Sequence, residues 1–234
     1  MKAIFVLVLR TQVTRGRVAA LGTVGLLGIV LGVAVGQGNT FDKADSAYDL
    51  IGSYGLNLLV PLTALVFAAA ALGDPTEDGT LVYLWHRPVP RTSIALAAWA
   101  AALCIAIPFA VLPTVLSALA TGTGSDVVAG AAAASLLATA AYSGLFLLLG
   151  LLVRRALTWG LTYVLIWEGF VARSGTGPAR LSILVYAQSV LADLADHEPP
   201  QLAASIPVAL LVPLSLGAIA VGFTIWSLRR LDVK

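Results

Sequence analysis

The chain has 234 residues, of which 59% are hydrophobic and 11% are charged, and its formal net charge is +2. Soluble domains carry roughly 25% charged residues, so a chain with this little charge and a mean hydropathy of +0.94 cannot cover a water-exposed surface. The composition excludes a soluble globular domain, and the small net charge gives no reason to expect a nucleic-acid partner.

Six continuous apolar segments divide the chain, which indicates that the lipid bilayer is its solvent and partner. A spanning helix needs about 20 apolar residues, and uninterrupted apolar runs predict helices rather than the alternating strands of a barrel. We predict an all-α polytopic fold, with residues 1–234 as one transmembrane domain. The expected spans are Val18–Val35, Ile51–Leu72, Ser93–Ala118, Val127–Val153, Leu157–Ala172 and Ala204–Leu228.

Basic residues favour one side of the predicted membrane. With the N-terminus in the cytoplasm, the outer segments contain only Lys43, Arg173 and Arg180, and the other 11 lysines and arginines lie inside. Cytoplasmic loops are enriched in Lys and Arg. Both termini are therefore expected in the cytoplasm, as an even number of spans requires.

Residues 1–17 precede the first span and combine apolar residues with basic ones. This pattern predicts an interfacial helix along the inner membrane surface, with a short basic tail as the alternative. The apolar stretch before Arg10 is too short for a cleavable signal peptide.

The first span carries Gly28, Gly32 and Gly36 at a spacing of four. This spacing places the glycines on one helix face, where a second helix backbone can approach closely. We predict a packing face, either within the protomer or across a dimer.

The segment 74–91 joins the second and third spans. Asp74 suits an N-cap, Pro75 suits the first helical position, and Glu77 completes a capping box. Pro88 and Pro90 prevent the helix from continuing. We predict a short, capped cytoplasmic helix with acids at its start and with Tyr83 and Trp85 near its end.

Glu168 is an acid within the predicted fifth span. A charged carboxyl group at bilayer depth costs about 2.5–3.5 kcal/mol, so it should face protein or water or be protonated. The functional interpretation is a translocation or gating residue. The structural alternative is a hydrogen bond to a neighbouring helix.

The longest outer connection covers residues 174–203. Apolar residues recur at helical spacing over Leu181–Ala195, and this apolar run is too short to span. We predict a surface or re-entrant helix at the outer mouth. His86 and His197 fall on opposite sides of the membrane, so no metal site is expected.

The segment 74–91 resembles the cytoplasmic loop of type-2 ABC exporter permeases, where Glu-x-Gly-Thr-Leu is followed by Arg-Pro-Val-Ser-Arg. Pro90 stands where that family usually has serine or threonine, and Asp74 replaces a more usual glutamate. The predicted topology is also similar over the whole chain, as is the Trp167-Glu168-Gly169 stretch. The residues that match the loop pattern are Glu77, Gly79, Thr80, Leu81, Arg87, Pro88, Val89 and Arg91.

The resemblance implies a permease subunit of an ABC exporter in a bacterial plasma membrane. The loop helix would couple it to a dimer of separate ATPase subunits, and the permease would pair with a second copy or a homologous permease. The alternative is a solvated connector with no partner. The implied coupling residues are Asp74, Glu77, Asp78, Gly79, Thr80, Leu81, Tyr83, Trp85, Arg87 and Arg91.

ATP and Mg²⁺ are expected on the partner ATPase, and no cofactor is expected on this chain. A phosphate-binding P-loop requires lysine after glycine, and Lys2, Lys43 and Lys234 do not meet this requirement. This chain is therefore not expected to be an enzyme that hydrolyses ATP through a P-loop.

Three other functions compete with this interpretation. An ion-coupled transporter or channel could use Glu168. An intramembrane protease could use Ser143, but neither histidine lies within a span to act as its base. A non-transporting assembly or sensory subunit could share the permease fold.

Overall fold

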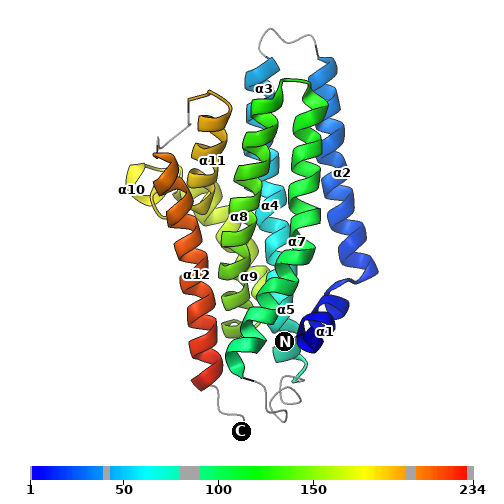
Figure 1. The fold of residues 1–234 in the computed structure, drawn as a ribbon, viewed down its shortest axis with the longest axis vertical. Helices are drawn as coiled ribbons and strands as arrows, with labels where there is room; N and C mark the ends of the chain where they lie inside the picture. Colours follow the sequence, from blue (N-terminus) through cyan, green and yellow to red (C-terminus); the bar gives the residue numbers. More distant parts are fainter. Residues whose placement is uncertain (1, 39–42, 80–89, 199–203, 231–234) are drawn as a thin grey trace.

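A computed structural model describes residues 2–38, 43–79, 90–198 and 204–230 of the chain. Every regular element in these ranges is a helix, and the long helices lie side by side in an elongated bundle (Figure 1). We call the end of the bundle that carries Arg17, Arg91, Arg154, Arg155, Arg229 and Arg230 the basic end. It lies at the bottom of Figure 1, where the last spanning helix ends.

The described part of the chain confirms an all-α membrane architecture. Five helices are long and apolar enough to span a bilayer: Arg15–Gln37, Lys43–Glu77, Arg91–Thr121, Ser125–Leu152 and Ile206–Arg230. They correspond to predicted spans one, two, three, four and six. The predicted fifth span forms a shorter helix.

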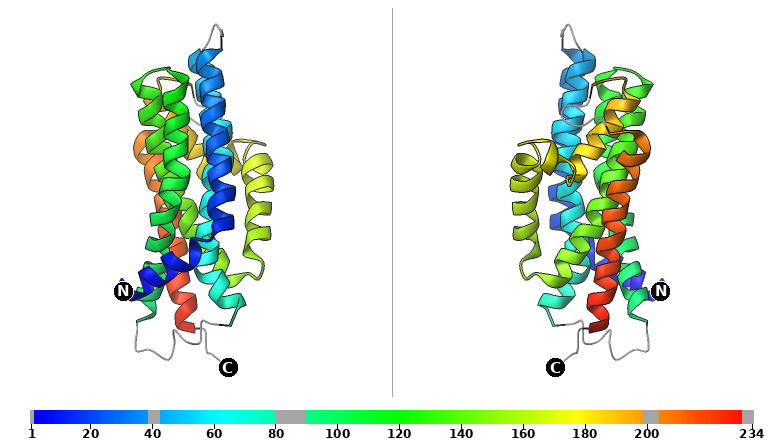
Figure 2. Two further views of the ribbon diagram at one scale, coloured as in Figure 1. Left: turned by 90° about the vertical axis from the view of Figure 1, so that its right-hand side faces the viewer. Right: turned by 90° about the vertical axis from the view of Figure 1, so that its left-hand side faces the viewer.

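The N-terminal residues form α1 (Lys2–Gln12), which is separate from α2 (Arg15–Gln37). Thr14 adopts an extended conformation between them, and its side chain accepts a hydrogen bond from the Arg17 backbone N–H. This N-cap starts α2 in a new direction. Figure 2 shows α1 running obliquely across the basic end, where it packs against the third span.

The second span is one helix of changing pitch. It consists of α3 (Lys43–Leu50), η1 (Ile51–Leu59), α4 (Val60–Ala64), η2 (Leu65–Ala69) and α5 (Ala70–Glu77), where η marks π-helical turns. The Val60 backbone N–H bonds to the carbonyl of Gly55, five residues earlier. Pro61 follows without an N–H to donate, which is a common cause of such irregular turns.

The third and fourth spans form the centre of the bundle as α7 (Arg91–Thr121) and α8 (Ser125–Leu152). Gly122 ends α7 in a left-handed conformation with φ of 67°, which suits glycine. Both α7 and α8 are rich in buried alanine, so their backbones approach closely.

The predicted fifth span is shorter than a full membrane crossing. It consists of α9 (Ala156–Thr162) and η3 (Tyr163–Val171), which form one apolar helix of fewer than 18 residues. At 1.5 Å per residue it rises about 24 Å, less than the roughly 30 Å hydrocarbon core. We call this helix span five.

Two helices follow span five, α10 (Thr176–Ala179) and α11 (Ile183–Leu194). In Figure 1, α11 continues upward from the level at which span five ends. The outer helix predicted over Leu181–Ala195 is thus present, but it is not a surface helix. Most of its residues are buried against α8 and against α12 (Ile206–Arg230).

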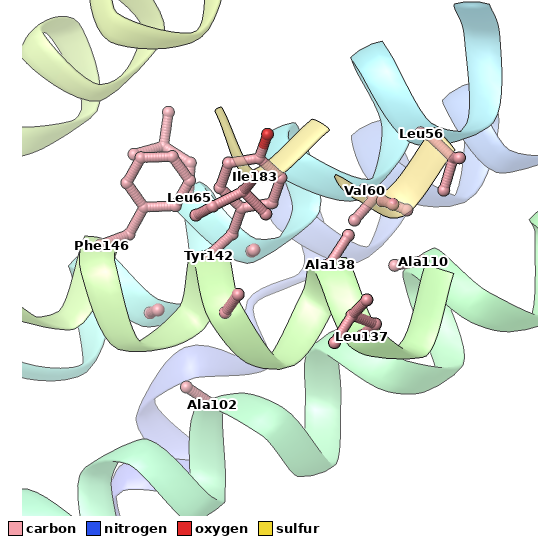
Figure 3. Close-up of a cluster of buried hydrophobic side chains, with 14 of the residues drawn as sticks. Leu56, Val60, Leu65, Ala102, Ala110, Leu137, Ala138, Tyr142, Phe146 and Ile183 are labelled. Carbon is pink, nitrogen blue, oxygen red and sulfur yellow. The ribbon is translucent and has the colours of Figure 1, made fainter. Parts of the chain in front are cut away.

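The apolar core surrounds α8, as Figure 3 shows. Ala138, Tyr142 and Phe146 project from α8 toward side chains of the second span and α11. The rings of Tyr142 and Phe146 are stacked, with their centroids 5.7 Å apart. Since α8 contacts every other spanning helix except α2 extensively, it is the scaffold that positions the rest.

Candidate coupling site

The predicted coupling segment is described at its two ends, over Asp74–Gly79 and Pro90–Arg91. The coupling candidates outside the described residues are Thr80, Leu81, Tyr83, Trp85 and Arg87. The two ends of the segment, which we call its roots, are the end of the second span and the start of the third. Both lie at the basic end (Figure 1).

The structure corrects the predicted helix start at Asp74. Residues 70–77 form α5, the last part of the second span, and Pro75 lies inside it. Helical turns already precede Pro75, so the proline costs one backbone hydrogen bond near the helix end instead of starting a new helix. The helix ends at Glu77, and Gly79, just beyond the C-cap Asp78, has a left-handed φ of 68°.

Asp74 forms an ion pair instead of an N-cap. Its Oδ2 lies 2.8 Å from Nη2 of Arg17, the third residue of α2. The Asp74 side chain is half exposed, so solvent weakens the pair, and such bridges contribute about 0–1 kcal/mol. The contact nevertheless joins the end of the second span to the start of the first.

Glu77 forms a second contact within the protein. Its Oε1 accepts a hydrogen bond of 2.7 Å from the backbone N–H of Arg155, in the turn between α8 and α9. Glu77 and Asp78 share an open cleft with Arg154 and Arg155. Glu77 does not complete a capping box with Asp74. It accepts a hydrogen bond from the start of span five.

Arg91 binds the end of the sixth span. Its Nη1 donates hydrogen bonds to the carbonyls of Leu228 and Arg229, at 2.6 and 2.9 Å. The last carbonyls of a helix lack partners within the helix and carry partial negative charge. The arginine satisfies two of them and joins the start of α7 to the end of α12.

The basic end is therefore held together by the described coupling candidates. Asp74, Glu77 and Arg91 contact the first, fifth and sixth spans, respectively. Their partners could not be predicted from local patterns, because the partners are 57 or more positions away. The only available signal was that Arg17 and Arg155 also flank apolar segments on the same predicted side.

Glu168 lies at the junction of η3 and α11, almost completely buried at 1% exposure. Its carboxylate accepts hydrogen bonds from the Tyr163 hydroxyl at 3.1 Å, from the Ser182 hydroxyl, and from the Ile183 backbone N–H at 3.3 Å. The Tyr142 hydroxyl lies close to it without the geometry of a hydrogen bond.

This arrangement places an acceptor at the first turn of α11. Ser182 is the N-cap of that helix, and its hydroxyl also accepts from the Val185 backbone N–H. Anions are stabilised at helix N-termini. The geometry thus matches the structural alternative for Glu168, a hydrogen bond to a neighbouring helix, and it joins the end of span five to α11.

The glycine face of α2 packs within the protomer. A Cβ added at Gly32 would clash with the Ser117 carbonyl of α7, and one at Gly36 would clash with that of Ala120. The Ser117 hydroxyl donates to the Gly28 carbonyl at 2.8 Å. Here these glycines allow α2 and α7 to approach closely.

A narrow apolar groove separates the second span from span five. Its lining includes Asn57, Leu58, Leu62, Leu161 and Leu165, and it lies between the π-helical segments η1 and η3. Figure 2 shows span five at the edge of the bundle beside the second span. Among the described residues, no cluster of three His, Cys, Asp or Glu could hold a metal ion.

Comparison with known proteins identifies the family. A family model described as ABC-2 family transporter protein matches residues 14–173, which include the first five predicted spans and the coupling segment. No individual curated protein sequence matches the chain. The matched range covers well over half of the chain, and the chain therefore belongs to the ABC-2 family of transporter proteins.

Proposed function

We propose that this protein is the permease subunit of an ABC exporter, driven by a dimer of separate ATPase subunits. The match to the ABC-2 transporter family over residues 14–173 carries the proposal. The chain's own lysines, Lys2, Lys43 and Lys234, do not form a P-loop, so ATP and Mg²⁺ bind to the partner.

The basic end faces the cytoplasm of a bacterial cell in this proposal. Arginines at the ends of five spanning segments gather there, as the enrichment of cytoplasmic loops in basic residues requires. Both termini and segment 74–91 then lie on the side where ATP is available. The ATPase docks on segment 74–91, and nucleotide-driven motion enters the permease through its two roots.

The translocation pathway forms between this chain and a second permease, a copy or a homologue. We assign the groove between the second span and span five to that face, because π-helical turns flank it on both sides and such turns are frequent at functional sites. Asn57 is the one polar side chain among its described lining residues. A lining of this kind suits a hydrophobic substrate.

The test is reconstitution with the ATPase chain. The permease and ATPase co-purify from cells that express both, and vesicles that contain the complex move substrate in a reaction that needs ATP and is blocked by vanadate. An exported substrate can be found by comparing extracellular metabolites with and without the protein. Transport that continues without ATP, or a permease that never associates with an ATPase, contradicts the proposal.

The geometry does not favour an ion-coupled transporter that uses Glu168. A coupling carboxylate must exchange ions with a water-filled path, whereas the Glu168 carboxylate is buried and accepts hydrogen bonds from Tyr163, Ser182 and Ile183. Its contacts hold two helices together.

A further inference from the structure

The contact between Glu77 and Arg155 joins two segments 78 positions apart. Glu77 is the last residue of α5, directly before the part of the coupling segment that would meet the ATPase. Arg155 is the N-cap of α9, the last residue of the turn that leads into span five. A single hydrogen bond of 2.7 Å thus connects the root of the coupling segment to the start of another span.

The turn at Arg155 needs this bond to keep its shape. Arg155 has φ of 59° and ψ of 45°, a left-handed conformation that L-residues with side chains adopt at a cost of about 1–2 kcal/mol. Its carbonyl accepts from the backbone N–H groups of Thr158 and Trp159, which starts α9. The Glu77 carboxylate occupies the Arg155 N–H and thereby fixes the residue from which α9 begins.

Close backbone packing surrounds the same contact. A Cβ added at Gly150 of α8 would clash with the Ala69 carbonyl, and one at Gly73 would lie 3.3 Å from the Gly150 carbonyl. At Gly160 of α9, an added Cβ would clash with the Leu65 side chain. The inner ends of the second, fourth and fifth spans therefore meet with little space between them, and a displacement of one presses on the others.

We infer that Glu77 is a positioning residue that transmits movement of the coupling segment to span five through the Arg155 backbone. This inference rests on the proposed function and changes the role of Glu77 within it. The carboxylate points to the permease's own turn and acts as a hydrogen-bond acceptor. An acid that docks on the ATPase would instead act through its charge.

Glutamine and alanine separate these two roles. Glu77→Gln keeps an oxygen that can accept the Arg155 N–H but removes the charge, whereas Glu77→Ala removes both. Arg154→Ala is the matched control, because it removes a charge from the same turn and leaves the bond intact. Each variant is compared with the wild type in the full permease–ATPase complex, measuring ATPase association, ATP hydrolysis and substrate moved per ATP.

We expect all three variants to bind the ATPase like the wild type. Substrate moved per ATP should fall at least about tenfold in Glu77→Ala, the ratio that corresponds to one lost hydrogen bond to a charged group. Glu77→Gln and Arg154→Ala should keep most of the wild-type ratio. Loss of ATPase binding in both Glu77 variants, or normal coupling in Glu77→Ala, overturns the inference.

A second measurement needs no ATPase and separates this inference from the proposed function. Hydrogen exchange of the permease alone should become faster at the Arg155 amide and along α9 in Glu77→Ala, and should change little in Glu77→Gln. Unchanged exchange in Glu77→Ala refutes the positioning role. If exchange changes as expected but no ATPase-driven transport is found in the wild type, the proposed function fails and the positioning contact stands.

Discussion

The crossing of α8 and α12 allows a stability prediction worked from distances. A Cβ added at Gly144 of α8 would lie 2.5 Å from the Gly217 carbonyl oxygen, 2.9 Å from the Gly217 Cα and 3.0 Å from its carbonyl carbon. All three are backbone atoms, which cannot rotate away. Since ordinary contacts begin near 3.4 Å, Gly144→Ala must separate the two helices by about 0.9 Å.

A separation of this size weakens the whole helix contact. A gap of 0.5–1 Å forfeits roughly a quarter to a half of the dispersion energy of the atoms involved, and overpacked substitutions typically cost about 1–3 kcal/mol. Because α12 contacts α8 along much of its length, we expect Gly144→Ala to lower the free energy of unfolding by about 2–3 kcal/mol.

The measurement is reversible unfolding of the purified permease in mixed detergent, followed by tryptophan fluorescence. Gly222→Ala on α12 is the control, since its Cβ would meet nothing within 4 Å, and it should not lower the free energy of unfolding, because alanine is the better helix former. Wild-type stability in Gly144→Ala, or equal losses in both variants, would refute the close crossing of α8 and α12.

The same unfolding assay tests five further substitutions at four positions. Glu168→Ala leaves the Ser182 hydroxyl and other buried donors unpaired and should cost at least about 2 kcal/mol, whereas Glu168→Gln retains an acceptor and should cost less than half as much. Asp74→Ala removes only a half-exposed ion pair and should cost less than about 1 kcal/mol, and this cost should shrink in high salt, which screens the pair. Gly79→Ala should cost about 1 kcal/mol through backbone strain alone, because its φ is 68° and nothing lies within 4 Å of the added Cβ. Gly32→Ala should destabilise the protomer by about 1–3 kcal/mol without altering self-association measured by cross-linking; a change in self-association alone would place this glycine face between copies.

The spans were predictable because the property that places a helix in the bilayer, a continuous apolar run, is visible in the local sequence. A lipid-embedded helix must be apolar over its whole length, so charge-free runs locate α2, α7, α8 and α12 without knowledge of their neighbours. The second span was placed correctly but begins earlier, at Lys43. Its polar first turns, including Asp45 and Asp49, continue the helix beyond the apolar run and so give no hydropathy signal.

The candidate site was less predictable because its contacts depend on tertiary structure. Asp74, Pro75 and Glu77 have the local pattern of a helix start, but the second span reaches them as a helix that is already formed. The helical turns that precede these residues therefore determine their conformation, and their own preference for a helix start does not. The partners of Glu77 and Arg91 are set by the meeting of distant helix ends, which no local pattern specifies.

Span five depends on polar contacts at its two ends more than on apolar burial. Leu165, Ile166 and Phe170 face outward, with 57%, 57% and 81% of their surface exposed in the protomer. Lipid or a second permease can cover them, but neither fixes the helix to this chain.

At its start the Arg155 N–H is held by Glu77, and at its end Glu168 is held by the N-terminus of α11. A helix with few buried contacts along its length and one polar anchor at each end can tilt between its anchors at low cost. If Glu77 positions span five as proposed, we expect a displacement at Glu77 to reach span five more readily than the other spans.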